Sequence, residues 1–76
     1  MYKLTEKVIG ILRDNQAMRL RVALGMGVGE SAVANSLKMT KGRSIANNLG
    51  AVETLMSELG LSKEDIVVEY ESKTSL

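Results

Sequence analysis

The pattern of apolar and polar positions predicts a helix at the start of the chain. Leu4, Val8, Ile11 and Leu12 stand at i, i+4, i+7 and i+8, the spacing that puts apolar side chains on one face of an α-helix. The polar pair Asp14–Asn15 follows directly and is predicted to end this helix.

Glycines divide the next part of the chain into two predicted helices. Residues 16–26 favour a helix because Val22 is their only β-branched residue. Gly27 is predicted to end it, since glycine readily adopts the positive φ of a helix stop. Gly29 permits the start of the next helix, which is predicted over 30–38.

The following segment, 39–48, is polar and basic, and it is predicted to be a loop whose end stays open, because Ser44, Asn47 and Asn48 could each cap the next helix. After it an apolar stripe at helical spacing predicts a further helix. The stripe consists of Leu49, Val52, Leu55, Met56 and Leu59. Gly60 followed by Leu61 is typical of a glycine stop with its hydrophobic contact.

The chain after Gly60 predicts one more short helix and an ambiguous end. Ser62 and Asp65 fit a capping box, in which the serine accepts from the backbone and the aspartate reaches back. The segment 67–71 holds β-branched and aromatic residues and alternates from Val68 to Glu71, so it is either an edge strand or a frayed tail. Together these elements predict an all-α bundle of about five short helices with a possible short C-terminal strand or tail.

Length and composition narrow the class of protein. A chain of 76 residues is predicted to form a single domain over 1–76. The absence of Cys and His removes disulfides, the usual metal ligands and the common nucleophile–base pairs, so we expect no metal, no cofactor and no enzyme activity. No apolar run approaches the roughly 20 residues of a membrane span, and no signal peptide is evident, which favours a cytoplasmic protein.

The net charge of +1 hides a division along the chain. Residues 13–43 carry six Lys and Arg against two Asp and Glu, whereas residues 44–76 carry two against six. A basic middle is typical of a protein that presents one face to a polyanion. Ordinary solvated charge is the alternative interpretation.

Within the basic middle, residues 19–38 have the spacing of a helix-turn-helix. Two helices that cross closely need a small residue, supplied by Ala23, and four residues later the turn needs the positive φ that Gly27 allows. Val28 after the turn and Val33 within the second helix are expected to anchor it.

With this motif the sequence resembles the Cro and repressor group of phage and bacterial regulators, which share the lambda-repressor-like fold. The resemblance extends to one helix before the motif, two after it, and a Gly-Leu-Ser-x-x-Asp-Ile ending over 60–66. The chain departs from the group at Ser36, where the group has an aliphatic or aromatic residue, and at Gly29, where it has a serine or threonine cap. We expect Leu37 to take over the packing role at the first place.

The resemblance implies that helix 30–38 lies in the major groove of DNA and reads bases. Asn35 is the leading candidate because its amide can pair with adenine, while Glu30 could accept from cytosine and Ala34 could touch a thymine methyl. The implied base-facing residues are Glu30, Ser31, Ala34 and Asn35. Each also has an ordinary interpretation: a solvated amide, a favourable charge at a helix start, or a good helix former.

The resemblance also implies phosphate contacts and a dimer. The implied phosphate-binding residues are Arg19, Lys38, Lys41 and Arg43. The expected partners are double-stranded DNA and a second copy of the chain, with 66–70 as the leading dimer contact. The alternative function is a helical protein-interaction module, such as an antirepressor or antitoxin, without direct DNA readout.

Overall fold

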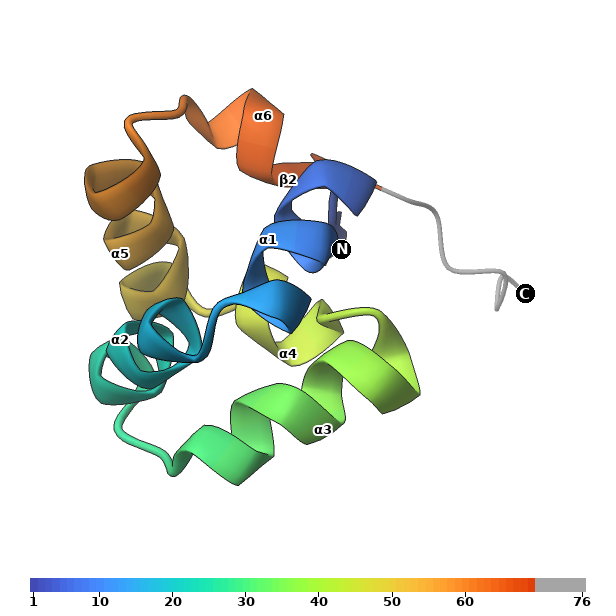
Figure 1. Ribbon diagram of the computed structural model, residues 1–76. Coiled ribbons are helices and arrows are strands. Elements are labelled where there is room, and N and C mark those ends of the chain that lie inside the picture. The colour runs from blue at the N-terminus through green and yellow to red at the C-terminus, as the bar shows by residue number, and fades with distance from the viewer. Residues whose placement is uncertain (70–76) are drawn as a thin grey trace.

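Six helices and two short strands make up residues 1–69, the part of the chain that the computed structural model describes (Figure 1). The predicted all-α class is confirmed, and of the two alternatives for the C-terminal segment the strand is present. In chain order the elements are β1 (Tyr2–Leu4), α1 (Glu6–Asp14), α2 (Gln16–Met26), α3 (Glu30–Thr40), α4 (Arg43–Ala46), α5 (Leu49–Leu59), α6 (Lys63–Ile66) and β2 (Val67–Glu69). None of the helices in this described range is both long enough and apolar enough to cross a membrane.

The bounds of α2 and the end of α5 are those predicted, and Asn48 is the one of the three candidate caps that begins α5. Both helices begin after an asparagine whose side chain accepts from the backbone: Asn15 from Met18 over 3.1 Å and Asn48 from Ala51 over 3.0 Å. Gly60 ends α5 with φ of +67°, as predicted for a glycine stop.

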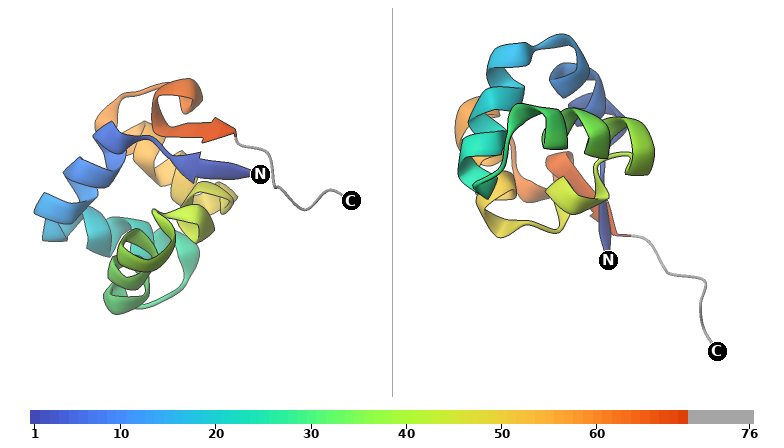
Figure 2. Two further views of the ribbon diagram at one scale, coloured as in Figure 1. Left: turned by 90° about the vertical axis from the view of Figure 1, so that its right-hand side faces the viewer. Right: turned by 90° about the horizontal axis from the view of Figure 1, so that it is seen from below.

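The prediction that Leu4 belongs to the first helix is wrong. Leu4 ends β1, which pairs antiparallel with β2 so that Leu4 lies opposite Val67. The apolar spacing still identified a core residue, since Leu4 is 2% exposed. The two strands come from distant parts of the chain and lie side by side in Figure 2. A strand of three residues is too short to show an alternating pattern.

The predicted loop over 39–48 is also corrected. Helix α3 continues to Thr40, two residues beyond the predicted end, and α4 occupies four residues within the supposed loop. Ile45 and Ala46 of α4 are buried in the core. A helix of one turn buries too few positions to establish a helical period, which is why the sequence predicted five helices rather than six.

The capping box at the start of α6 is wrong in its hydrogen bonds. The Ser62 hydroxyl donates to Asp65 Oδ2 over 3.0 Å and accepts no bond from the backbone. The helix is nevertheless short and begins where predicted, at Lys63. Val67–Glu69 forms a strand, which decides the ambiguity there, whereas Tyr70 and Glu71 lie outside the described residues.

Side chains from both strands and all six helices contribute to the core. Helices α2 and α5 approach most closely at two glycines, because a Cβ placed on Gly50 would collide with the Gly25 carbonyl oxygen. A Cβ on Gly25 would lie 2.5 Å from Thr54 Oγ1 and 3.1 Å from the Gly50 oxygen. This crossing fixes α2 against α5 and leaves α3 packed on the other side of α2 (Figure 1).

Candidate functional site

A tight turn joins α2 to α3. Gly27 has φ of +74°, as predicted, and its N–H donates to the Leu24 carbonyl, while the N–H of Val28 donates to the Ala23 carbonyl over 3.0 Å. These bonds satisfy carbonyls at the end of α2. Ala23 and Val33 are buried as expected, but Val28 is 41% exposed, so it does not anchor the turn in the core.

Helix α3 has a buried side and an exposed side. Val33 is 1% exposed, and Leu37 packs against the core from a partly buried position. Ser31, Asn35 and Lys38 are exposed and stand at i, i+4 and i+7, so they share one outer face of the helix. Two of the four predicted base-facing residues therefore lie on this face, at Ser31 and Asn35.

The other two predicted base-facing residues have neighbours within the protein. Ala34 is half-buried and lines a groove between α1 and α3. Glu30 accepts from Arg19, with 2.6 Å between Oε2 and Nε. The outer face of α3 thus holds fewer of the base-facing residues than the resemblance implied.

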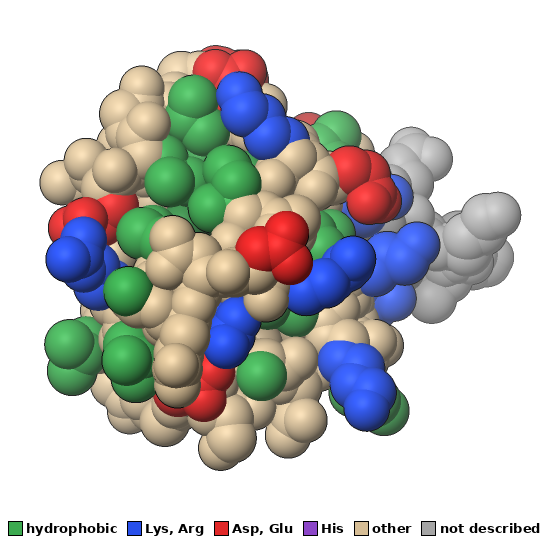
Figure 3. All heavy atoms as spheres, in the orientation of Figure 1, with side chains coloured by type: hydrophobic (Ala, Val, Ile, Leu, Met, Phe, Trp, Pro, Cys, Tyr) green, Lys and Arg blue, Asp and Glu red, His purple; other side chains and the backbone are tan. Residues whose placement is uncertain are grey.

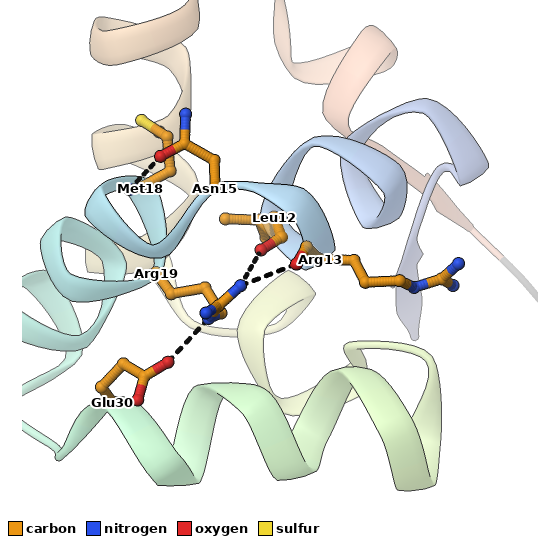
Figure 4. Close-up of polar contacts among 6 residues, drawn as sticks. All are labelled: Leu12, Arg13, Asn15, Met18, Arg19 and Glu30. Atoms are coloured by element: carbon orange, nitrogen blue, oxygen red, sulfur yellow. Dashed lines mark hydrogen bonds and ion pairs between the residues drawn. The ribbon is translucent and has the colours of Figure 1, made fainter.

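Arg19 connects three helices rather than standing on the surface. Its Nη1 donates to the backbone carbonyls of Leu12 and Arg13, each over 2.8 Å, while its Nε bonds Glu30. Figure 4 shows the guanidinium between the end of α1 and the start of α3. The side chains of Arg19 and Glu30 are only 19% and 27% exposed. Their pairing was missed because the sequence analysis gave each residue a separate external partner.

Ser36, where the chain departs from the Cro and repressor pattern, is buried within a small hydroxyl cluster. Its Oγ lies 2.7 Å from Ser44 Oγ, and Thr40 Oγ1 donates to the Ser36 carbonyl over 3.0 Å. Because the buried hydroxyl has partners, the polar residue is accommodated there at little cost. The cluster also ties the end of α3 to α4.

The end of α3 has an unusual backbone. Lys41 has φ of +55°, and among residues 1–69 no other residue except glycine has a positive φ. Gly42 follows with φ of +78°, and its N–H donates to the Ser36 carbonyl over 2.9 Å. Lys41 and Arg43 are both exposed beside this turn.

A groove of about 650 Å³ separates α1 from the C-terminal part of α3. Figure 3 shows this face of the molecule, with Lys and Arg side chains over α1 and over α3. The lining residues are Glu6, Ile9, Arg13, Arg19, Ala34, Leu37, Lys38 and Lys41. Arg13 was not a candidate from the sequence, although it belongs to the basic segment and follows the first apolar stripe.

Comparison with known proteins gives no match to this chain, whether among protein-family models, curated proteins or solved structures.

Proposed function

We propose that this protein is a transcriptional regulator of the Cro and repressor type, and that it binds double-stranded DNA sequence-specifically with α3 in the major groove. The observation that carries the proposal is the outer face of α3. It is exposed, it follows a tight glycine turn, and it presents small and polar side chains at Ser31 and Asn35. A major groove about 12 Å wide admits one helix with side chains of this kind.

The distribution of cations supports the same proposal. Lys38 extends the outer face of α3, and Lys41 and Arg43 lie exposed just beyond its end. Cations that flank a groove-reading helix neutralise phosphates and set its register, while the helix itself distinguishes bases. Arg13 on α1 adds a further exposed cation on the same side of the molecule.

The structure suggests a different division of roles from the one implied by resemblance. We propose that Arg19 and Glu30 hold α3 in place instead of contacting DNA, because their charged groups already bond each other and the end of α1. Direct base reading then rests on Asn35 and Ser31, with Asn35 suited to an adenine through its amide.

We further propose that the regulator acts as a homodimer, since two-fold operators space their half-sites by one DNA turn. Ile66 and Val67 are buried in the core of their own chain, so they are not available as the expected contact. Val68 is 42% exposed and remains a candidate. Sedimentation should therefore show a weaker dimer for Val68→Lys than for the parent chain, and an unchanged dimer would place the contact elsewhere.

One observation favours the alternative of a protein-interaction module. Leu24 and Leu49 are 81% and 73% exposed and adjoin the two glycines of the α2–α5 crossing. Large apolar side chains at a surface are typical of protein contacts when they form a continuous patch. This surface belongs to α2 and α5, so it does not depend on the outer face of α3.

Selection of bound duplexes from a random pool, followed by a salt titration of affinity, separates the two functions. A regulator should enrich one sequence, and the logarithm of its affinity should fall linearly with the logarithm of salt concentration as counterions are released. The control is a scrambled duplex of the same length. No enrichment and no salt-dependent binding of any duplex would reject DNA recognition in favour of the interaction module.

A further inference from the structure

The groove between α1 and α3 has an apolar floor and a cationic rim. Ile9 and Leu37 face it from opposite helices, and Ala34 leaves room between them because its side chain is small. Arg13, Lys38 and Lys41 line the same groove. A volume of about 650 Å³ is in the range of small-molecule sites, which run from roughly 300 to 1,000 Å³.

The rim cations have no carboxylate partner in the described part of the chain. The ion pairs within residues 1–69 are Arg19–Glu30 and Arg21–Glu58, and neither includes a rim cation. Arg19 also lines the groove, but its charge is balanced by Glu30. Glu6 is the one acidic residue of the lining, so the three rim cations outnumber it.

Lys41 is held at this rim at an energetic cost. A non-glycine residue in the left-handed region loses roughly 1–2 kcal/mol relative to ordinary backbone. Glycine at this place would avoid that cost, as it does at the neighbouring Gly42. Lys41 is the C-cap of α3, where a left-handed residue commonly ends a helix, and its side chain lines the groove from that place.

We propose that this groove is a binding site for a small organic anion with an apolar body, such as a medium-chain carboxylate. The rim cations hold the charged head by charge-assisted hydrogen bonds, and the body covers the accessible parts of Ala34 and Leu37, above the buried Ile9. An inorganic anion would leave Ala34 and Leu37 partly exposed to water, and a neutral apolar molecule would leave the cations unpaired. Both halves of the ligand are therefore required.

The anion site does not depend on DNA binding. Its regulatory role rests on the proposed function. Lys38 and Lys41 would then serve both the small anion and the phosphates of DNA. Since one cation cannot satisfy both ligands fully, occupation of the groove weakens duplex binding. The small molecule thus acts as an inducer that releases the protein from DNA.

The test is an NMR titration of the full ¹⁵N-labelled chain with octanoate, beside 1-octanol and inorganic phosphate as probes that each lack one half of the ligand. Octanoate should shift the amide signals of Ile9, Ala34 and Leu37 saturably. Its affinity should exceed that of either other probe by about tenfold or more, because octanol lacks a charge-assisted bond and phosphate lacks the buried apolar body. Equal affinity for octanol, or for phosphate, would overturn the proposal, as would the absence of saturable shifts.

Three variants sharpen the result. Arg13→Gln removes a rim charge and should weaken octanoate by about tenfold. Ala34→Leu places a larger side chain in the groove and should weaken octanoate binding by a similar factor. Thermal melts must show that this variant is folded. Arg21→Gln loses the same charge outside the groove and should leave the affinity unchanged. If Arg21→Gln weakens octanoate as much as Arg13→Gln does, only overall charge attracts the anion and no groove site exists.

A second titration distinguishes failure of this site from failure of the proposed function. Octanoate is added to the complex of the parent chain with its selected duplex, and displacement is followed by fluorescence anisotropy. Displacement that is lost in Ala34→Leu supports the regulatory role. If the protein binds octanoate but no duplex, the anion site is retained and DNA recognition is rejected. If it binds a duplex but not octanoate, DNA recognition is retained and the anion site is rejected.

Discussion

Arg19 and Glu30 meet across the turn between α2 and α3, with 2.6 Å between Nε and Oε2. Arg19 also donates hydrogen bonds to two backbone carbonyls near the end of α1. One guanidinium group therefore links the start of α3 to the end of α1. The orientation of the exposed face of α3 depends on this connection. A substitution at either residue should therefore lower both the stability of the protein and its affinity for DNA.

The first prediction concerns this pair. Arg19→Gln should lower the free energy of unfolding by about 2 kcal/mol, because bonds from a charged group to two carbonyls and a carboxylate are lost. Glu30→Gln should cost less, about 1 kcal/mol, since Arg19 keeps its carbonyl partners. Urea melts of both variants and the double variant measure the coupling, which should reach about 0.5 kcal/mol or more. Strictly additive effects would show that the two residues act separately.

The second prediction concerns the turn. Gly27→Val should destabilise the protein by more than about 1 kcal/mol, because a β-branched residue is strained at φ of +74°. A Cβ at Gly27 would meet nothing within 4 Å, so backbone strain alone is responsible. Gly27→Asn is the control and should cost less, since asparagine tolerates the left-handed region. An unchanged denaturant midpoint for Gly27→Val would disprove the turn.

The third prediction concerns the crossing of α2 and α5. Gly50→Ala should destabilise by about 1–3 kcal/mol, because the added methyl collides with the Gly25 carbonyl, which cannot move without its helix. Gly10→Ala makes the same chemical change within α1, where a Cβ meets nothing within 4 Å. It should stabilise by about 0.5–1 kcal/mol through helix propensity. Thermal melts that shift both variants in one direction would contradict the close crossing.

The sequence was sufficient for the long helices because an apolar period runs along α1 and α5, while helix propensity and the glycines at 27 and 29 mark α2 and the start of α3. The sequence did not predict β1 and α4. These elements have only three and four residues, and their conformation depends on contacts with distant parts of the chain. Ile45 and Leu4 were identifiable as apolar but not as parts of a one-turn helix and a strand. The same limit applies to the site: the resemblance implied an outward Asn35, whereas the pairing of Arg19 depends on how three helices meet.

The fourth prediction separates base reading from phosphate binding in the proposed regulator. Asn35→Ala should remove about 1–3 kcal/mol of discrimination at one base position, with little effect on nonspecific affinity. Lys41→Ala should instead weaken all duplexes alike and reduce the slope of log affinity against log salt by about 1. Arg43→Ala should behave as Lys41→Ala does. If Asn35→Ala weakens selected and scrambled duplexes equally, its role in readout is excluded.

The fifth prediction opposes stability to binding at one residue. Lys41→Gly should raise the free energy of unfolding by about 0.5–1 kcal/mol, because glycine adopts the left-handed backbone without strain. The same variant should bind duplex DNA more weakly, since a cation is lost. Lys41→Arg keeps both charge and strain, and it should change neither quantity much. A stabilised Lys41→Gly with full duplex affinity would remove Lys41 from the binding surface.

The pairing of β1 with β2 has a consequence for how the protein is made. Leu4 and Ile66, at 2% and 0% exposure, belong to one core, and the Thr5 N–H donates to the Ile66 carbonyl over 3.0 Å. These contacts join residues far apart in the chain, so their loop-closure entropy exceeds that of contacts within a helix, and we expect them to form after the helices. While residue 66 of a nascent chain is still inside the ribosome, the earlier segments can form helices. The core then still lacks Ile66 and Val67. We therefore expect folding to be completed only after β2 has emerged from the ribosome.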